Sequence, residues 1–388
     1  MKIFEALDRR RRWSGEEALI LEQVQRVVAE SIAPHAARFD ANGEFPTSSV
    51  EALNGLGLNA IFIPEAHGGI GAPFRLYAEI VKTISAACAS TGIIYATNMH
   101  AIGPLIEFGT EEQKARFLPR MFEGGLAALA ITEAEAGSDA IGMQTRFTPD
   151  GDSIVIDGSK LFITSGDVAD LILLFGKWSD IADPKRAISV LVLKKGTPGF
   201  SVNAIEKKMG HRASSTAALS FSGVRVPRAN LVGAPGDGLK ILLASLNRSR
   251  PSIAAHAIGI ARAAFADTVE YINLRRQSGH RIVEFQGIQF LLADLASELA
   301  LTEAWLDHVC AQIDDGERDF GVEASIAKMR ASDLAMRMTT EAVQLHGGSG
   351  YCQDLRVERL MRDAKITQIW EGTNQVHRQF IGKSFVRK

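Results

Sequence analysis

One acidic residue near the end of the chain stands in a setting that chemistry could use. Glu371 lies between Trp370, which ends an apolar run, and Gly372-Thr373, where we expect a helix to begin. Thr373 suits an N-cap, because its hydroxyl can accept a hydrogen bond from a backbone N–H that the first helical turn leaves unpaired. Two roles are open to Glu371 on this basis: an acid that only complements the helix dipole, or a positioned carboxylate that the indole partly shields from water.

Two stretches in the middle of the chain carry hydroxyl groups next to small residues. In the first, Thr132 is followed by Gly137-Ser138-Asp139, so backbone N–H groups and hydroxyls could bind a phosphate or the polar edge of a ring. In the second, residues 158–166, Phe162 and Thr164 share one face of an expected strand. The first stretch is equally compatible with a strand-to-turn connection, and the second with ordinary packing.

Several other kinds of site are not indicated. The cysteines Cys88, Cys310 and Cys352 form no CxxC pair, the nine histidines include no HExxH or HxH pattern, and no acidic run has the spacing of a calcium loop. We therefore expect no metal and no disulfide framework. The glycines of residues 68–71 lack the GxGxxG pattern between a strand and a helix, so a Rossmann dinucleotide site is not supported.

Length and composition describe an ordinary soluble protein with more than one domain. At 388 residues the chain is too long for one simple core, and its 46% hydrophobic and 23% charged residues are typical of globular proteins. A net charge of −2 argues against nucleic-acid binding. No stretch reaches the roughly 18 to 20 apolar residues that span a bilayer, and the N-terminus lacks a signal-peptide core, so we expect no membrane contact and a cytoplasmic location.

The periodicity of apolar residues divides the chain into a helical, a β and a second helical part. Residues 1–126 are expected to form an N-terminal helical domain, with a capping box at Thr110 and Gln113. Residues 127–234 are expected to form a β domain, and residues 235–388 a helical bundle with breaks near Gly279 and Gly316. Helices are predicted at 15–39, 48–56, 74–90, 92–108 and 326–345, and strands at 152–158, 171–175, 188–193 and 217–226.

Motifs along the whole chain occur together and in the order of one known family. They are FGTEEQK (108–114), TEAEAGSD (132–139), GSKLFITSG (158–166), MGHRASST (209–216), VRVP (224–227), LNRSR (246–250), RRQSG through EFQ (275–286), QLHGGSGY (344–351) and IWEGT (369–373). Each motif is weak alone, but their joint order is very specific. On these motifs the sequence resembles the acyl-CoA dehydrogenase family of flavoproteins along essentially its whole length.

The resemblance implies an α+β multidomain fold with an N-terminal helical domain, a middle antiparallel β domain and a C-terminal four-helix bundle. It also implies FAD, held where the β domain meets the C-terminal bundle, and a homotetramer in which a neighbouring subunit completes the site. The cofactor-binding residues that it implies are Thr132, Gly137, Ser138, Phe162, Ile163, Thr164, Arg275, Gln277, Gln286, Gln344, Leu345, Gly347, Gly348, Thr373 and Gln375. The neighbouring subunit would contribute Arg275, Gln286, Gln344, Gly347 and Gly348.

Four positions depart from the usual pattern of the family. Ser278 stands where Phe is common, which removes an aromatic ring from the adenosine end, and Phe162 replaces a usual Trp while keeping a flat apolar face. Ala134-Glu135 replaces the common Pro-Gly, and Trp370 stands where Tyr is frequent, so that its bulk could reshape the neighbouring pocket. None of these changes touches the central chemistry.

Glu371 matches the catalytic base of the family. The α-hydrogen of a thioester is a weak acid, so its removal needs an oriented base and stabilisation of the charge that develops on the carbonyl oxygen. The resemblance implies that Glu371 takes this proton while a hydride passes from the β-carbon to FAD, which gives a trans-2-enoyl-CoA. Some relatives place the base at the position of Ser249, which cannot serve here. The residues expected to contact the acyl-CoA substrate are Ser138, Asn247, Arg250 and Gly372.

The expected partner is an electron-transferring flavoprotein, which would take the electrons from FAD. Two alternatives stay open: the same fold acting on an acyl-carrier-protein thioester or using oxygen, and a non-catalytic flavin or acyl-CoA binding protein. The sequence does not set the length, branching or ring character of the acyl group, because a few pocket side chains decide these. Tyr95, Asn98 and Met99 are candidates for lining the acyl tail, although a packing role suits them equally.

Overall fold

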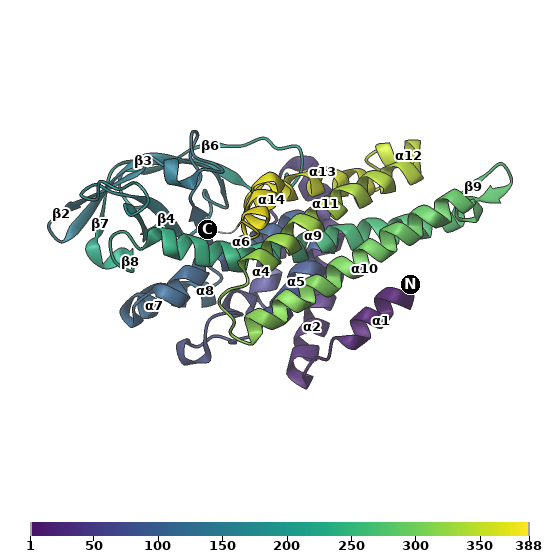
Figure 1. Cartoon of the computed structure of the whole chain (residues 1–388), viewed down its shortest axis with the longest axis horizontal. Helices are drawn as coiled ribbons and strands as arrows, with labels where there is room; N and C mark the ends of the chain where they lie inside the picture. The colour runs from purple at the N-terminus through teal and green to yellow at the C-terminus, as the bar shows by residue number, and fades with distance from the viewer. Residues whose placement is uncertain (1, 387–388) are drawn as a thin grey trace.

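The computed structural model describes residues 2–386 and places a β sheet at one end of a long helical body (Figure 1). A short hairpin projects from the opposite end, so different elements form the two ends of the molecule. Along the chain, helices come first, then the strands of the sheet, then a second set of helices. This order confirms the expected three-domain α+β fold.

The N-terminal helices are close to those predicted from periodicity. The predicted helix 15–39 is interrupted by a π turn at Val28–Ile32 and a 3-10 turn at Ala33–His35. Pro34 explains the interruption, because it has no N–H to continue the α-helical ladder. The capping box is confirmed, since Thr110 and Gln113 exchange hydrogen bonds at 3.0 and 3.3 Å. The helices are α1 (Lys2–Arg10), α2 (Gly15–Val27), α3 (Ala36–Asn42), α4 (Thr47–Asn54), α5 (Phe74–Ala87), α6 (Ala89–Phe108), α7 (Glu111–Phe117) and α8 (Pro119–Phe122).

The sheet follows the order β6-β7-β3-β2-β4-β5-β8, and β1 pairs with β4. Most neighbours are antiparallel, as expected, but β1 and β2 each pair with β4 in parallel. Three of the predicted strands lie within β4, β5 and β7, and the fourth, 152–158, begins one residue before β3. The predicted strands do not include the others: β1 is alanine-rich, β2 contains Pro149, β6 is mostly exposed and β8 has two residues. The strands are β1 (Ala127–Ala130), β2 (Arg146–Asp150), β3 (Ser153–Thr164), β4 (Leu171–Trp178), β5 (Ile188–Lys194), β6 (Phe200–Ile205), β7 (Thr216–Pro227) and β8 (Leu231–Val232).

Four long helices form the C-terminal bundle: α9 (Gly238–Leu274), α10 (Gln286–Asp314), α11 (Gly321–His346) and α13 (Val357–Thr367). α11 packs against α9, α10 and α13. The breaks at Gly279 and Gly316 are confirmed. Between α9 and α10, the strands β9 (Arg276–Gln277) and β10 (His280–Arg281) flank the turn Ser278-Gly279, whose φ values of +52° and +83° suit a two-residue hairpin. The remaining helices are α12 (Gly348–Tyr351) and α14 (Asn374–Lys383).

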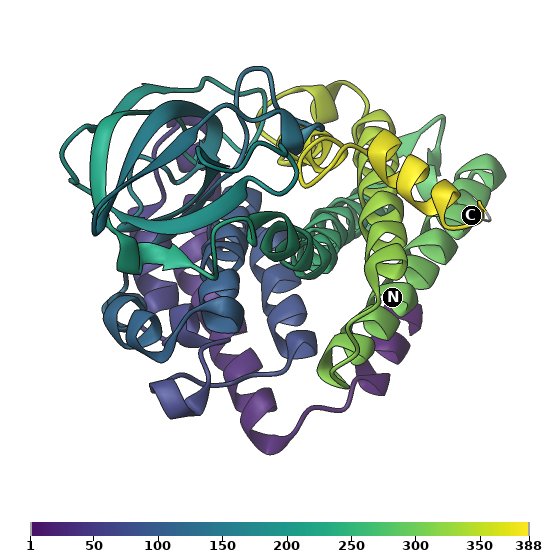
Figure 2. The ribbon, with the colours of Figure 1, turned by 60° about the vertical axis from the view of Figure 1, so that its left-hand side comes forward.

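Two apolar cores hold these parts together. The larger core combines α5, α6, α9 and α11 with one face of the sheet, so the N-terminal and C-terminal helices are packed as one body. The strand β4 contributes Leu171 and Leu173 to this core, and Ile172 and Leu174 to the second core on its other face. Figure 2 shows the sheet lying over the N-terminal helices. The helices α5, α6 and α9 therefore meet in the middle of the molecule.

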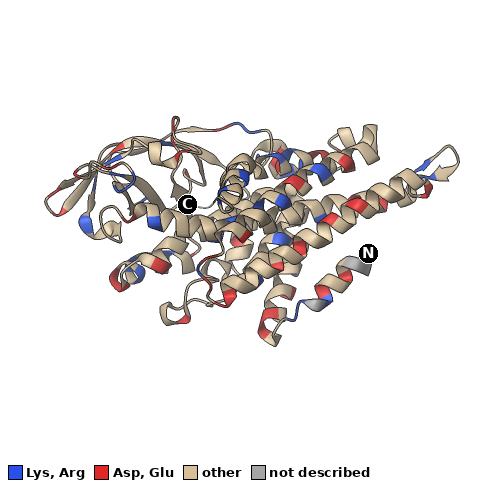
Figure 3. Ribbon diagram, in the orientation of Figure 1, with Lys and Arg blue, Asp and Glu red and all other residues tan. Residues whose placement is uncertain are grey.

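The surface carries both signs of charge. Figure 3 shows lysines and arginines interspersed with aspartates and glutamates over the helices. Within residues 2–386, no helix is both long and apolar enough to cross a membrane.

Candidate active site

Glu371 lies in the short link between α13 and α14, and its backbone conformation is unusual. Its φ is +53° and that of Gly372 is +90°, both in the left-handed region that a residue with a side chain seldom adopts. Thr373 caps α14 as expected, because its hydroxyl accepts a hydrogen bond from the N–H of Val376 at 3.3 Å. The side chain of Glu371 is only 16% exposed, so this sharp turn holds a carboxylate inside the protein.

Two polar side chains from distant helices lie beside the two oxygens of Glu371. The hydroxyl of Ser249, on α9, donates a hydrogen bond to Oε2 at 2.5 Å. Nδ1 of His100, on α6, lies 4.0 Å from Oε1. Burial lowers the pKa of His100 against the opposing pull of Glu371, so its imidazole is neutral at pH 7. No local pattern in the sequence predicts either contact, because both join segments more than a hundred residues apart.

Lys328, on α11, fixes the link that follows Glu371. Its ammonium donates hydrogen bonds to the carbonyl oxygen of Gly372 at 2.7 Å and to Oδ1 of Asn374 at 3.0 Å. Burial lowers the pKa of Lys328 to about 7, although the charge of Glu371 opposes this shift. Gly372 is needed here, because a Cβ would lie 3.2 Å from Nε2 of His377 and the φ is positive. The backbone of the link is therefore held independently of the Glu371 side chain.

His100 and Ser249 also line a cavity of about 270 Å³ that α5, α6 and α9 surround. Its walls are largely apolar and include four aromatic rings from α5, α6 and the segment before them. The cavity is lined by Phe62, Phe74, Tyr77, Met99, His100, Gly103, Pro104, Ile106, Glu107, Phe108, Ser245, Arg248 and Ser249. An apolar chamber thus adjoins the two side chains that contact the buried carboxylate.

The three residues considered for an acyl tail have different surroundings. Met99 lines the cavity. Asn98 instead joins α6 to β1 and to Asn59: its Oδ1 accepts from the N–H of Ala127 at 2.6 Å and its Nδ2 donates to Asn59 at 3.1 Å. Tyr95 is buried, and its hydroxyl has no partner in the described part of the chain. The packing role therefore fits Asn98, while Met99 is placed to meet a ligand.

Trp370 packs against two buried histidines. Its ring centroid lies 5.0 Å from that of His211 and 5.8 Å from that of His256. The two imidazoles meet through their Nε2 atoms at 2.9 Å, and the N–H of His211 donates to Oδ1 of Asp363 at 2.5 Å. Burial raises the pKa of Asp363 to about 7, against the effect of this hydrogen bond. The bulk of Trp370 is thus accommodated by a polar cluster inside the protein.

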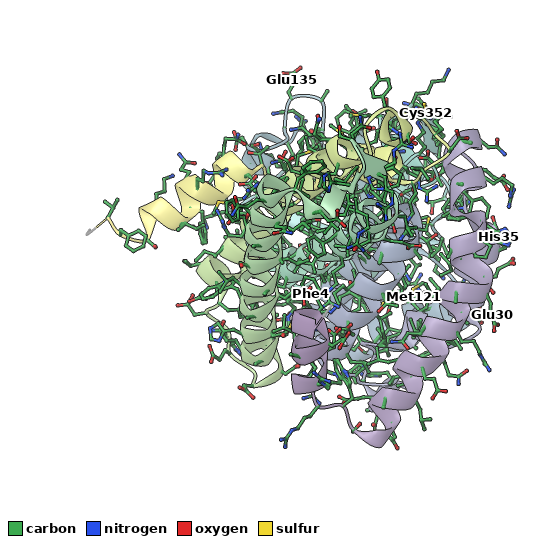
Figure 4. The ribbon with its side chains drawn as sticks, turned by 90° about the vertical axis from the view of Figure 1, so that its right-hand side faces the viewer. Phe4, Glu30, His35, Met121, Glu135 and Cys352 are labelled. Atoms are coloured by element: carbon green, nitrogen blue, oxygen red, sulfur yellow. The ribbon has the colours of Figure 1, made fainter. Side chains whose placement is uncertain are left out.

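The loop after β1, residues 132–138, is anchored by a buried ion pair. Glu133 accepts hydrogen bonds from the N–H of Thr145 at 3.0 Å and from Nζ of Lys160 at 2.7 Å. Burial lowers the pKa of Lys160 to about 8, while Glu133 opposes the shift. Glu135, in contrast, points away from the protein (Figure 4). The sequence analysis did not single out Glu133 or Lys160; the only signal was their place inside two of the motifs. The loop leaves Thr132 half-buried and Gly137 and Ser138 exposed.

Phe162 presents its ring to solvent at an irregularity of β3. Its φ is +59°, it is 57% exposed, and the pairing of β3 with β7 changes register between Lys160 and Ile163. An aromatic ring held outward by strained backbone offers a flat apolar face to a ligand. Ile163 is buried and Thr164 is half-buried beside it, and the buried hydroxyl of Ser165 lacks a hydrogen-bond partner among residues 2–386. These features fit a flat ring with a polar edge.

The residues expected to bind the adenosine half of FAD lie at the end of the molecule opposite to the sheet. The hairpin and the start of α10 carry exposed Arg275, Gln277 and Gln286. The end of α11 and the start of α12 carry exposed Gln344, Gly347 and Gly348 next to buried Leu345. Figure 1 shows this end opposite to the sheet, so one chain does not bring these residues to Phe162. A Cβ at either glycine would meet nothing within 4 Å, which leaves room for a ligand.

Arg250 and Asn247 contact each other on α9. Nη1 of Arg250 donates to Oδ1 of Asn247 at 3.0 Å and to the hydroxyl of Ser325 at 3.3 Å. The guanidinium carbon lies 5.6 Å from the ring centroid of Phe380. Arg250 is buried, and burial lowers its pKa. Gln375, at the start of α14, is exposed.

Models of one family match nearly the whole chain. Residues 14–125 match the N-terminal domain of acyl-CoA dehydrogenases, residues 128–224 the middle domain and residues 236–386 the C-terminal domain. A probable acyl-CoA dehydrogenase of Mycobacterium leprae is 41% identical over 97% of this chain and 99% of its own length. The structure of butyryl-CoA dehydrogenase from Megasphaera elsdenii matches with a TM-score of 0.94 and 37% identity, over 97% of this chain and 100% of that one. A structure described as the electron transferring flavoprotein of Acidaminococcus fermentans matches with a TM-score of 0.94 and 36% identity, over 97% and 99%.

Proposed function

The chain belongs to the acyl-CoA dehydrogenase family, and we propose that it desaturates an acyl-CoA between the α- and β-carbons with Glu371 as the base. It is an oxidoreductase that acts on acyl-CoA. The placement of Glu371 carries the proposal for the base. This carboxylate is mostly buried, two of its neighbours line an apolar cavity, and no lysine or arginine of the described residues lies within 4.0 Å of it. A carboxylate without a paired cation keeps its capacity to take a proton.

FAD is the cofactor of this family, and the structure offers surfaces that fit it. We propose that Phe162 lies against the flat ring system, that Thr132, Gly137, Ser138, Ile163 and Thr164 contact its polar edge, and that Thr373 and Gln375 complete this half. The support is the outward, strained Phe162 beside the unpartnered hydroxyl of Ser165. When bound, FAD supplies the acceptor for the hydride that leaves the β-carbon.

The residues of the chain perform the proton half of the reaction. Glu371 takes the α-proton, the broken C–H bond leaves its electron pair on the substrate, and the thioester oxygen gains negative charge. We propose that the backbone N–H of Glu371 donates to this oxygen, which is the reason for the positive φ. Gly372, Asn247 and Arg250 are the proposed contacts of the thioester and its head group, together with Ser138. The product is a trans-2-enoyl-CoA.

The cavity favours a short or compact acyl group. Its volume of about 270 Å³ is small beside the roughly 300 to 1,000 Å³ of pockets for drug-sized ligands. Aromatic rings and Met99 provide apolar contacts for such a group.

We propose a homotetramer, and the separation of the two half-sites supports a contribution from a neighbouring subunit. Arg275, Gln277, Gln286, Gln344, Leu345, Gly347 and Gly348 would serve the FAD of a neighbouring subunit, because their own chain holds them far from Phe162. Exposed apolar side chains surround this end and α14, which is the pattern of a buried subunit interface. They are Leu274, Phe285, Phe290, Leu301, Tyr351, Phe380, Phe385 and Val386.

The electron acceptor is proposed to be an electron-transferring flavoprotein. The support is the match to a structure described by that name. A reducing, cytoplasmic location is proposed on the three free cysteines, of which Cys88 and Cys310 are buried and Cys352 is exposed.

Anaerobic mixing of the holoenzyme with short, branched, cyclic and long acyl-CoA thioesters tests the function. We expect bleaching of the flavin absorbance with at least one short or compact thioester. A holoenzyme that no thioester bleaches would support a non-catalytic binding protein instead. Faster reoxidation of the flavin by oxygen than by an artificial electron acceptor would support an oxidase. Bleaching only by acyl-carrier-protein thioesters would show that the substrate is a carrier-protein thioester and not an acyl-CoA.

A further inference from the structure

The tautomer of His100 is set by the group around its other nitrogen. Ser252, on α9, donates its hydroxyl hydrogen to the carbonyl oxygen of Ser249 at 2.9 Å, because a carbonyl oxygen can only accept. We assign the Ser252 oxygen as the acceptor in its contact with Nε2 of His100, which places the ring hydrogen on Nε2. A neutral imidazole holds one such hydrogen, and Nδ1 of His100 therefore has a bare lone pair.

This lone pair is buried and lies beside an acceptor. Nδ1 of His100 has no hydrogen-bond partner among residues 2–386, and the side chain is only 5% exposed. It lies 4.0 Å from Oε1 of Glu371, beyond hydrogen-bond distance. Two acceptors attract each other only when a proton lies between them. The arrangement is thus incomplete until Glu371 takes a proton.

We propose that His100 is the proton-side partner of Glu371. When Glu371 takes the α-proton of a thioester, the C–H bond breaks, its electron pair stays with the substrate, and the new O–H of Glu371 donates to Nδ1 of His100. The inference rests on the proposed function, since it gives the same base a positioning residue. Ser249 acts in the opposite sense, because its hydroxyl donates to Oε2 and favours the charged carboxylate.

The two neighbours of the base therefore stabilise different protonation states of Glu371. His100 stabilises the carboxyl group and Ser249 stabilises the carboxylate. Replacing one or the other must therefore change the balance between the carboxyl group and the carboxylate in opposite directions. A residue that only fills space would not produce this pair of opposite shifts.

Other ionisable groups act on this pair from all sides and are the same in every variant of the test. They are Arg250 and His256 on α9, Lys328 on α11, Tyr77 on α5 and His377 on α14. Burial lowers the pKa of Lys328 to about 7, which lies in the working range. The measurement must therefore observe the carboxyl group itself. Because Glu371 and His100 share a proton, the observed midpoint belongs to the pair.

Infrared difference spectra of the purified full-length protein across a pH titration provide this readout. A protonated carboxyl group has its own carbonyl stretching band, and the band that Glu371→Gln removes belongs to Glu371. His100→Gln keeps a donor for Ser252 near the position of Nε2 but removes the acceptor near Glu371. His100→Asn is the matched control, because its Oδ1 lies near the position of Nδ1 and can accept.

We expect His100→Gln to lower the midpoint by about 0.5 to 1 pH unit, the size of one hydrogen bond. Ser249→Ala should raise it by a similar amount, and His100→Asn should shift it less than His100→Gln. The acid limb of kcat/KM should move in the same directions. An unchanged midpoint in His100→Gln, or an upward shift in that variant, would overturn the proposal. The infrared result does not depend on turnover, so its failure is distinguishable from absent flavin bleaching, which would overturn the proposed function.

Discussion

Two buried glutamates of this protein are surrounded in opposite ways. Glu303, on α10, has a side chain that is 1% exposed and contacts two guanidinium groups: Nη2 of Arg11 lies 3.1 Å from its Oε2, and Nη2 of Arg262 lies 2.5 Å from the same atom. Arg262 continues the network to Asp8. Glu371 has a serine hydroxyl and a neutral imidazole instead. The chain thus pairs one buried carboxylate directly with cations, whereas Lys328 and Arg250 act on the other only from a greater distance.

The difference separates a carboxylate that holds structure from one that can do chemistry. Burial opposes ionisation of Glu303, but the hydrogen bond from Arg262 and the charges of Lys82, Arg262 and Arg11 hold its pKa below the usual range. Such a group keeps its charge and cannot act as a base that cycles between two states. Glu371 also sits on strained backbone, whereas Glu303 lies within a regular helix. Burial alone does not distinguish a functional acid; its partners do.

The largest expected effect comes from Glu371→Gln. The amide keeps the size of the side chain and cannot take the α-proton, so turnover with an artificial electron acceptor should fall at least about 10²-fold. FAD absorbance and the melting temperature should stay close to those of the parent protein, because the link is held through Lys328. Near-normal turnover in this variant would mean that Glu371 is not the base and differs from Glu303 only in its surroundings.

Glu303→Gln should act on stability instead. Removing the charge takes the most buried acceptor from Arg11 and Arg262, which both keep Asp8 as a partner, and costs about 3 kcal/mol, the low end for a buried pair. Chemical denaturation at fixed protein concentration measures this loss, and turnover per folded enzyme should be retained.

The matched control for that variant is Glu44→Gln, at the exposed ion pair between Arg38 and Glu44. Such a pair contributes less than about 1 kcal/mol. Equal losses in the two variants would mean that the Glu303 network is no stronger than a surface contact.

Asp363→Asn sharpens the comparison with a third buried carboxyl group. Burial raises the pKa of Asp363 from its ordinary value of 3.8 to about 7, so the folded protein binds its proton more tightly than the unfolded chain. Stability from this group is therefore full at low pH and is lost as pH rises toward 7. The free energy of unfolding of the asparagine variant, measured relative to that of the parent, should therefore be higher at pH 8 than at pH 5. The expected difference is on the order of 2 kcal/mol. Parallel stability curves for the two proteins would contradict this assignment.

Thr373→Ala should have the smallest effect. Losing the N-cap of α14 costs about 1 kcal/mol. Because Thr373 is only two residues from Glu371, the link that holds the base should become less rigid, and both stability and turnover should fall modestly. Thr110→Ala removes a similar cap from α7, which contributes no residue to the cavity lining, and should lower stability without changing turnover. Equal turnover in the two variants would show that the cap does not position the base.

Local signals in the sequence account for much of the fold. The helical and β periods predict the three parts, and short-range pairs such as Thr110 with Gln113 predict where helices begin. The predicted strands do not include β6, which is short and mostly exposed, or β1, which is alanine-rich and has no alternating apolar pattern. Parallel pairing of β1 and β2 with β4 also lies beyond local signals, since it depends on long connections.

The site divides in the same way. Thr373 as a cap was predicted from neighbouring residues, while the motifs supplied Glu371 through a family resemblance. His100 and Ser249 beside Glu371, and Lys160 beside Glu133, could not be predicted, because packing between distant helices or strands decides these contacts. For Ser249 the resemblance indicates only that a base is missing at this position. Its hydrogen bond to the base became visible only in three dimensions.

Anaerobic stopped-flow bleaching of the flavin tests the contrast between the glutamates most directly. One acyl-CoA that bleaches the parent holoenzyme is mixed with Glu371→Gln and with Glu303→Gln at a temperature where all three are folded. We expect bleaching in Glu371→Gln to be at least about 10²-fold slower than in the parent, and bleaching in Glu303→Gln to match the parent. Bleaching of Glu371→Gln at the parent rate would contradict the role of Glu371 as the base.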